Sequence, residues 1–492
     1  MDSLKVAIVG GGIGGLSAAY YLFKAADGAG LAVDVSVYEA EGRWGGKINT
    51  VSMEGFLVEE GPDSFLTTKP WALELCEELG ISDQLIPTLP SRHRTYILSR
   101  GRLFPLPGGL IGMLPADLRE LMASPLFTRR GKLRMLFDLI LPARRAYDDE
   151  SLHSLISRRL GEEVYSKLFG PLMGGVYGAN GSELSVQAVL PHLLELEARY
   201  GSLLLGANQL YKQNRRERAN KGVGDSSPFL APRQGMRALV DSLLAKLEGG
   251  GVSLYPGHAL TKLTKPGKRY ALHFAKSHVS DHSLAPSDKE ADAVILAAPA
   301  YVVSNWLVSI DNALAEDLAR IEFAPSVTVS LAFHSSEVPR PFDAHGYLIP
   351  KSEGRTALAC TWVSSKFPGR SPKNKILCRL FFNQIVSGDA GDSDGSHYID
   401  LARREIGDTL GIKASPRLAH AKAWGRAMPQ YKLGHLKRVE EIEKKLGRHP
   451  GLYLVGNSYR GIGIPDTIHR SKEIAGEFLQ WARRRMQEKI PN

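Results

Sequence analysis

The pattern of apolar and polar positions at the N-terminus predicts a βαβ unit. Residues Lys5–Val9 form a short apolar run followed by a glycine-rich turn. Residues 16–22, with the sequence LSAAYYL, then favour a helix. After a polar linker, the β-branched run Val33–Tyr38 predicts a second strand. The chain therefore begins as a doubly wound α/β domain would.

The periodicity of apolar positions is different in the middle of the chain. Helical periodicity dominates from about residue 90 to 210, so we expect a mostly helical insert over residues 92–210. Residues 211–228 are charged and contain Gly and Ser, which predicts a flexible loop.

Strand patterns return in the second half. They cover residues 252–255, 291–297 and much of 326–386, and a polar insertion at 273–292 predicts the tip of a hairpin. The chain ends with a strand at 452–455, a glycine turn and a helix through 474–486. The length of 492 residues corresponds to about three domain-sized units.

Composition narrows the class of protein. The three cysteines, Cys76, Cys360 and Cys378, are too scattered for a disulfide framework or a metal site. No signal peptide and no spanning apolar segment is evident, so we expect a cytoplasmic protein. The net charge of +10 suits an acidic substrate or an anionic surface, and without a nucleic-acid motif we expect no nucleic-acid partner. The sequence does not decide the oligomeric state, and a homo-oligomer is one of the alternatives.

A dinucleotide fingerprint follows the first strand. Gly10, Gly12 and Gly15 form G-x-G-x-x-G between a strand and a helix. These glycines permit a tight turn, a close approach to a pyrophosphate and close helix packing. Glu39 ends the second strand, where an acid accepts ribose hydroxyls and disfavours NADP. FAD and NAD share this pattern.

Further motifs favour FAD. The segment Gly42–Lys47 (GRWGGK) resembles the R-x-G-G-[RK] signature of the monoamine-oxidase-like flavoenzyme superfamily. The strand at 453–457 with the turn GIGIPD at 461–466 resembles the C-terminal return of that superfamily, which lies beside the flavin ring. Residues 291–299 resemble the middle strand of its FAD domain, and Leu260 falls where relatives hold adenine.

Four separated motifs resemble the porphyrinogen oxidases more closely. They are GPDS at 61–64, GPLMGGVYG at 170–178, WGRAMPQY at 424–431 and GIPD at 463–466. From about residue 4 to 480 the chain is similar to the bacterial branch of the oxygen-dependent protoporphyrinogen/coproporphyrinogen oxidase family. Another flavin oxidoreductase, such as an amine oxidase or a carotene desaturase, is the alternative, and a non-catalytic flavin-binding protein is a third.

The resemblance implies an activity and a cofactor site. It implies a late step of haem biosynthesis, in which FAD and O2 aromatise a porphyrinogen and release H2O2. No residue is singled out as catalytic and no metal is expected, because the flavin carries the chemistry. The implied FAD contacts are Gly10, Gly11, Gly12, Ile13, Gly14, Gly15, Glu39, Ala40, Arg43, Gly46, Lys47, Gly61, Pro62, Asp63, Ser64, Leu260, Trp424, Gly456, Ile462, Gly463 and Ile464.

Substrate contacts are expected from cations and an apolar helix. Propionates buried against a macrocycle need positive partners, and Arg94 and then Lys69 are the candidates. Val176 is expected to face the ring, and Asp63 to lie near both ring and flavin. Coproporphyrinogen III is the favoured substrate, with protoporphyrinogen IX left open.

The expected fold is α/β, with three parts. A discontinuous Rossmann-like FAD-binding domain takes residues 1–66, 229–300 and 418–492, and an α+β substrate-binding domain takes 67–91 and 301–417. The helical insert contains apolar runs at 110–114 and 133–141 beside Arg129, Arg130, Lys132, Arg144 and Arg145. A peripheral helix at an anionic membrane and an ordinary core helix both fit this pattern.

Overall fold

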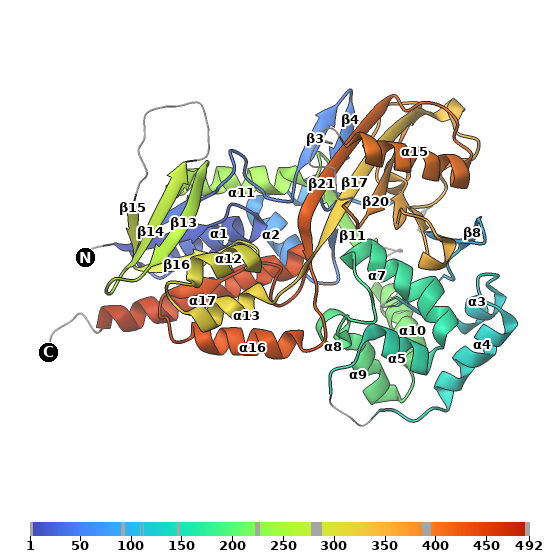
Figure 1. Cartoon of the computed structure of the whole chain (residues 1–492), viewed down its shortest axis with the longest axis horizontal. Helices are drawn as coiled ribbons and strands as arrows, with labels where there is room; N and C mark the ends of the chain where they lie inside the picture. The colour runs from blue at the N-terminus through green and yellow to red at the C-terminus, as the bar shows by residue number, and fades with distance from the viewer. Residues whose placement is uncertain are drawn as a thin grey trace.

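Three layers are arranged side by side in the computed structural model (Figure 1). The structure describes residues 3–89, 94–108, 110–111, 113–144, 148–221, 227–276, 288–385 and 395–487. A five-stranded sheet with helices forms one end, a seven-stranded sheet lies above the other end, and a helical layer lies below that sheet. The predicted α/β fold class is confirmed.

The five-stranded layer is parallel and begins with the predicted βαβ unit. Its strands, in spatial order, are β12 (Ser253–Tyr255), β2 (Val33–Tyr38), β1 (Leu4–Val9), β16 (Ala293–Leu296) and β22 (Leu452–Leu454). Strand β1 is central and buried on both faces: Val6 and Ile8 enter one core, while Ala7 and Val9 enter another. This continuous burial explains why the strand reads as an unbroken apolar run.

Helices and a small sheet cover the two faces. One core joins α1 (Ile13–Gly28), α2 (Trp71–Leu79), α11 (Arg237–Gly249) and α17 (Ile464–Gln487). The other joins α12 (Ala300–Leu307), α13 (Asn312–Ala319), α16 (His435–Leu446) and the antiparallel sheet of β13 (His258–Thr264), β14 (Tyr270–Lys276) and β15 (Asp288–Ala291). Strands β14 and β15 pair as a hairpin would, and the expected tip at 277–287 lies outside the described residues.

The seven-stranded sheet forms the second layer. In spatial order it contains β21 (Leu418–Pro429), β17 (Phe323–His334), β20 (Lys375–Phe382), β19 (Ala359–Thr361), β18 (Gly346–Leu348), β7 (Tyr96–Ser99) and β8 (Arg102–Pro105). Helix α15 (Ser396–Leu410) packs on its apolar core, and α14 (Val363–Lys366) connects β19 to β20.

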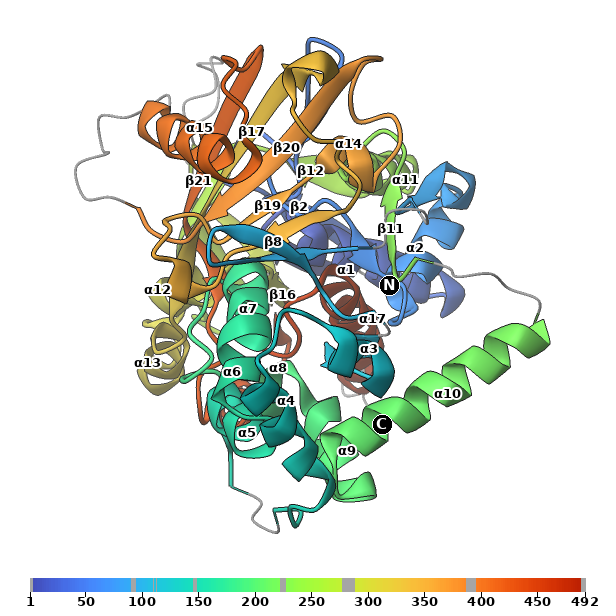
Figure 2. The ribbon, with the colours of Figure 1, turned by 90° about the vertical axis from the view of Figure 1, so that its right-hand side faces the viewer.

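The helical layer has its own core and forms the third layer. It contains α3 (Leu118–Ala123), α4 (Arg129–Leu136), α5 (Leu152–Arg159), α6 (Glu162–Val164), α7 (Gly170–Tyr177), α8 (Val186–Val189), α9 (Pro191–Tyr200) and α10 (Leu203–Lys221). Helix α10 extends away from the body of the layer (Figure 2). Shorter strands are β3 (Thr50–Met53), β4 (Phe56–Glu59), β5 (Phe65–Leu66), β6 (Leu85–Pro87), β9 (Leu110–Ile111), β10 (Leu114–Pro115) and β11 (Phe229–Pro232).

Several expected boundaries were wrong. Residues 418–429 form β21 and pair with β17 in the seven-stranded sheet, from Ala332–Leu418 to Phe323–Pro429, with one irregularity between Ala324 and Ser326. Strands β7 and β8 belong to that sheet too, although they lie inside the expected helical insert. Helix α2 buries its apolar stripe in the core of the five-stranded layer, and not in the substrate-binding layer. Local patterns specify an element but not its distant partner.

Two expected local structures were also wrong. The segment expected as a loop at 211–228 continues α10 as far as Lys221, and residues 222–226 lie outside the described part. Its Lys, Arg, Gln and Ala residues are good helix formers, so a helix already begun can continue into solvent. At the apolar run 110–114, β9 (Leu110–Ile111) pairs antiparallel with β10 (Leu114–Pro115) where a helix was expected, since the run is too short for a helix.

Candidate functional site

The N-terminal turn (residues 10–15) connects β1 to α1. A side chain on Gly15 would collide with the carbonyl oxygen of Gly10, so the helix can pack this closely only with glycine. A side chain on Gly12 would meet no heavy atom within 4 Å. The turn therefore leaves open space beside Gly12, directly at the N-terminus of α1, where backbone N–H groups attract phosphate.

Glu39 lies against this turn at the end of β2. Its Oε2 accepts the N–H of Gly11 at 2.6 Å, and its Oε1 accepts the N–H of Glu41 at 2.8 Å. Burial raises the pKa of Glu39, and these hydrogen bonds oppose the shift. The N–H of His258 donates to the carbonyl of Glu39 at 2.7 Å, which brings the start of β13 and Leu260 to the same end of the sheet.

The second glycine segment packs directly on the first. The N–H of Gly45 donates to the carbonyl of Gly11 at 2.8 Å. The Arg43 guanidinium donates to the carbonyl of Gly46 at 2.7 Å, so it stabilises its own turn.

Lys47 supplies a cation with no acidic partner among the described residues. Its Nζ donates to the carbonyl of Ala427 at 2.7 Å, and burial lowers the pKa of Lys47 to about 8. Burial without a counter-ion favours the neutral amine of Lys47, whereas a nearby anionic group would favour the charged ammonium. The open space at Gly12 and this ammonium thus fit a dinucleotide phosphate group.

The C-terminal turn (residues 456–463) lies between β22 and α17. The Ser471 hydroxyl in α17 donates to the carbonyl of Gly14 at 2.9 Å. A side chain on Gly14 would lie 3.1 Å from Thr467. The helix at the end of the chain therefore packs beside the turn at its start. Gly456 follows Val455, which would lie 3.6 Å from a side chain on Gly14, and Ile462 and Gly463 directly precede Ile464, the first residue of α17.

The loop at residues 61–64 is held by ion pairs. Both Asp63 oxygens accept from Lys366 Nζ at 2.9 Å, and Arg379 Nη2 lies 3.4 Å from Asp63. Burial alone would raise the pKa of Asp63, but Lys366 and Arg379 hold it well below its ordinary value. Arg379 also donates to the carbonyls of Glu59 and Gly61, both at 2.9 Å. Asp63 thus anchors the loop through its pairs with two cations.

Trp424 connects the seven-stranded sheet to this loop. Its Nε1 donates to the carbonyl of Glu60 at 2.9 Å. The Glu60 carboxylate accepts from His420 at 2.9 Å, and His420 lies four residues before Trp424 on the same face of β21. Hydrogen bonding from His420, aided by Asn49 and Lys422, lowers the pKa of Glu60 to about 2. The sequence-predicted FAD segments are therefore contiguous in space.

The candidate substrate residues are placed differently. Lys69 is 43% exposed and its Nζ lies 2.6 Å from Asp466, so an internal acid already neutralises it. Arg94 is exposed and has no ion pair within the described ranges. Val176 lies in α7, but its side chain is outside the described part. Of the two candidate cations, only Arg94 is unpaired.

Sequence reasoning missed several residues of this region. Lys366, Arg379 and Asp466 complete charged pairs with distant residues, and Tyr177 approaches Asp466, which together with burial raises the pKa of Tyr177 to about 12. Lys366 and Arg379 lie more than 300 positions from Asp63 in the sequence. Asp63 follows Glu59 and Glu60 in the sequence, and no local pattern there distinguishes it or identifies the distant cations that pair with it.

Comparisons with known proteins agree with this geometry. Residues 13–478 match the family described as flavin containing amine oxidoreductase. The chain is 30% identical to the coproporphyrinogen III oxidase of Bacillus subtilis (strain 168), over 97% of this chain and 98% of that protein. It is 28% identical to the chloroplastic protoporphyrinogen oxidase of Nicotiana tabacum, over 96% and 85%.

A solved structure shows the same fold. A protein from Exiguobacterium sp. 255-15 that is assigned as a protoporphyrinogen oxidase superimposes with a TM-score of 0.82 at 26% identity, covering 97% of this chain and 99% of that one. The open space at Gly12, the acid Glu39 at the end of β2 and the buried Lys47, which has no acidic partner among the described residues, are compatible with a flavin dinucleotide. The chain belongs to the flavin containing amine oxidoreductase family, and its cofactor is FAD.

Proposed function

We propose that this protein is an FAD-dependent oxidase that aromatises a porphyrinogen in haem biosynthesis. The observation that carries the proposal is the similarity over nearly the whole chain to coproporphyrinogen III oxidase and protoporphyrinogen oxidase. FAD, when bound, supplies two-electron oxidation, with O2 as the final acceptor and H2O2 as the product. Aromatising a porphyrinogen removes about six hydrogens, so the complete reaction needs about three such rounds.

The five-stranded layer is the proposed FAD-binding domain. We assign to it most of residues 1–66 and 229–300 and the C-terminal part of the chain from β22 onward. Gly12 gives the pyrophosphate its approach, Glu39 holds the ribose and Lys47 balances the phosphate charge. Asp63 forms ion pairs with Lys366 and Arg379, and these pairs fix the loop at residues 61–64, which is proposed to face the flavin ring.

Helix α7 forms the proposed substrate-facing wall. It packs under the seven-stranded sheet, because a side chain on Gly175 would lie 3.4 Å from Leu348 and 3.7 Å from Ala359. Arg94 is the proposed propionate partner, since it is exposed and unpaired among the described residues. Arginine pairs with carboxylates through two parallel hydrogen bonds. Coproporphyrinogen III, with more propionates than protoporphyrinogen IX, is the proposed physiological substrate.

Side-by-side aerobic turnover tests the function. The purified yellow protein is mixed with each porphyrinogen, and porphyrin fluorescence and oxygen consumption are followed together. We expect faster turnover of coproporphyrinogen III, while a preparation of the Gly12→Val variant without flavin controls for non-enzymatic oxidation. Faster turnover of protoporphyrinogen IX would contradict the substrate choice, and no turnover of either compound would contradict the proposed function.

Contact with an anionic membrane is proposed for the helical layer. Leu133 is 62% exposed and Ile140 is 76% exposed, in a segment that also exposes Phe137 and contains Arg129, Arg130 and Lys132. Exposed apolar side chains next to cations suit the interface of an anionic bilayer. No helix in the described part is long and apolar enough to span a membrane.

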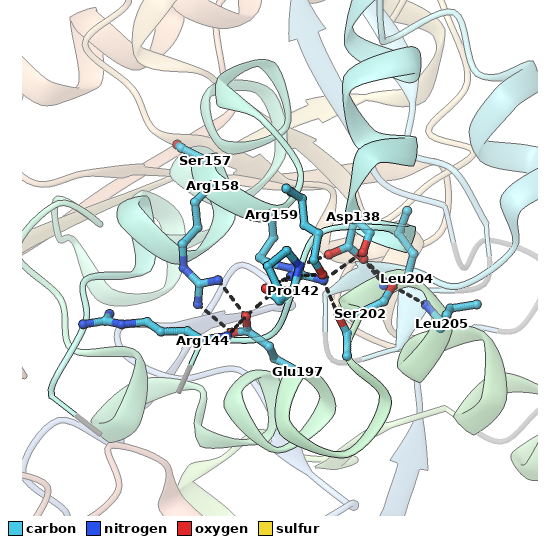
Figure 3. Close-up of polar contacts among 12 residues, drawn as sticks. Asp138, Pro142, Arg144, Ser157, Arg158, Arg159, Glu197, Ser202, Leu204 and Leu205 are labelled. Atoms are coloured by element: carbon cyan, nitrogen blue, oxygen red, sulfur yellow. Dashed lines mark hydrogen bonds and ion pairs between the residues drawn. The ribbon is translucent and has the colours of Figure 1, made fainter. Parts of the chain in front are cut away.

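A buried ion pair supports this exposed segment (Figure 3). Asp138 is fully buried and Arg159 is 1% exposed, and their side chains are 2.5 Å apart. Arg159 also donates to the carbonyls of Leu141 and Pro142, both at 3.1 Å. The segment is therefore held in place while its apolar side chains face outward. Flotation with anionic liposomes tests the proposal, and the absence of salt-sensitive co-flotation would contradict it.

A further inference from the structure

The connection from β21 to the first residue of α16, residues 430–435, touches all three layers. We call it the junction segment. Toward the helical layer, the N–H of Ser185 donates to the carbonyl of Tyr431 at 2.9 Å. The N–H of Gly434 donates to Asp149 at 2.7 Å, and Asp149 also accepts from the Ser185 hydroxyl at 2.6 Å. These bonds fasten the junction segment to the helical layer.

The junction segment also contacts the end of α7. The Gln430 side chain donates to the carbonyl of Tyr177 at 3.0 Å, where α7 ends. Lys432 Nζ lies 2.8 Å from Glu183 in the helical layer and 2.7 Å from Glu322, which precedes β17. The junction segment therefore fixes the position of α7, the proposed substrate-facing helix, relative to the seven-stranded sheet.

Two buried rings extend from the junction segment to the C-terminal turn. The Tyr431 hydroxyl donates to the carbonyl of Asn457 at 2.8 Å, and His435 Nε2 lies 2.8 Å from the carbonyl of Tyr459. The two rings stack with centroids 3.8 Å apart at 14°, and the residues are 1% and 0% exposed. A stacked pair of aromatic rings leaves little freedom for either contact to shift.

The chemistry of His435 follows from its surroundings. A carbonyl only accepts hydrogen bonds, so Nε2 must carry the proton, and Nδ1 has no partner among the described residues. Burial lowers the pKa of His435 to about 4, so the ring is neutral near pH 7. Its contribution is a single directed donor, and not a charge.

The two contacts fix the peptide planes of the C-terminal turn. In a trans peptide the N–H of the next residue points away from the carbonyl. Anchoring the carbonyls of Asn457 and Tyr459 therefore turns the N–H groups of Ser458 and Arg460 away from the two rings. Gly461 to Gly463 follow directly, and they have few side chains of their own to fix their position.

We propose that Tyr431 and His435 are positioning residues that hold the C-terminal turn, and with it the flavin, at a fixed distance from α7. The inference rests on FAD as cofactor, and only its turnover assay rests on the proposed function. The two rings act through the backbone of the turn, while Gln430 acts on α7. A substrate oxidised in successive rounds requires this geometry to persist between rounds.

The test removes one donor at a time from the flavin-loaded protein. Tyr431→Phe deletes a hydroxyl, His435→Phe keeps the stacked ring without the donor, and His435→Gln restores a donor. The matched control is Tyr398→Phe, because the Tyr398 hydroxyl makes an equivalent bond to the carbonyl of Gln384 at 3.1 Å, in the seven-stranded layer. The measurements are hydrogen–deuterium exchange of residues 456–463, the flavin absorption spectrum, kcat and KM.

Loss of one donor should speed exchange in the C-terminal turn, shift the flavin spectrum and lower kcat about threefold to tenfold, the equivalent of one hydrogen bond. KM should stay within about twofold, and His435→Gln should recover much of the loss. Variants that match Tyr398→Phe in exchange, spectrum and kcat would overturn the proposal. If the wild type oxidises no porphyrinogen, the proposed substrate fails, but exchange and spectrum still decide this inference. If Tyr431→Phe does not fold, the two His435 variants decide it.

Discussion

The five-stranded layer and the helical layer are held together by different means. Around the N-terminal turn, glycines let backbone approach backbone, and the main contacts are between neighbouring peptide groups. In the helical layer, Arg158 pairs with Glu150. Figure 3 shows that Arg158 also pairs with Glu197 and that Arg159 pairs with Asp138. The first arrangement leaves space for a ligand, whereas the second fills its interior with compensated charge. The two regions should therefore fail in different ways when a residue is changed.

The largest expected effect concerns two glycines of the N-terminal turn. Gly12→Val should fold, because its side chain enters open space, but FAD affinity should fall by about a hundredfold. Gly15→Val should not fold, because its side chain would collide with the Gly10 carbonyl. Flavin absorbance and circular dichroism of the two variants check this. A Gly12→Val protein with full flavin content would contradict the placement of the pyrophosphate.

The helical layer should respond strongly to loss of one partner of a buried pair. Arg159→Met leaves Asp138 charged and buried, so the free energy of unfolding should fall by about 3–5 kcal/mol. In the control Arg320→Met, the lost cation is 64% exposed and Asp317 keeps its second partner Lys445, so the change should cost about 1 kcal/mol or less. Urea unfolding measures both. Equal losses would mean that the network in Figure 3 contributes no more than surface charge.

The charged pair of Glu60 with His420 should give a pH-dependent effect. The pKa of Glu60 is lowered to about 2 by its hydrogen bond with His420, against an ordinary value of about 4.3. A depressed pKa stabilises the fold above the ordinary value and loses that contribution as pH falls toward 2. Glu60→Gln should therefore be less stable than wild type at pH 7, with a smaller difference at pH 3. The exposed Glu290→Gln control should show no such trend, and a difference that grows on acidification would contradict the assignment.

The smallest effect is expected at the proposed propionate cation. Arg94→Ala should raise KM about threefold with a smaller change in kcat, because an exposed ion pair is weak and is retained in the transition state. Lys69→Met should change KM less, since Asp466 already neutralises Lys69. Steady-state kinetics with both porphyrinogens measure these constants. An unchanged KM in Arg94→Ala would remove Arg94 from the substrate site.

Local sequence was sufficient for elements whose geometry depends on nearby residues. Strand β2 was predicted at its observed bounds, and the glycine turn, β1 and α1 were predicted from one contiguous stretch. It was insufficient where an element chooses among partners. Residues 418–429 were placed with the C-terminal strand, yet they pair with β17. The run at 110–114 was too short to distinguish a helix from a hairpin.

The sequence by itself determined the backbone part of the site, because glycine spacing and the position of Glu39 act within one βαβ unit. Only the tertiary structure decided which charges are free. In the fold, Lys69 forms an ion pair with Asp466, and Asp63 forms ion pairs with Lys366 and Arg379. Lys47 has no acidic partner among the described residues. Ion pairs form between side chains that are close in space, and sequence separation carries almost no information about that distance.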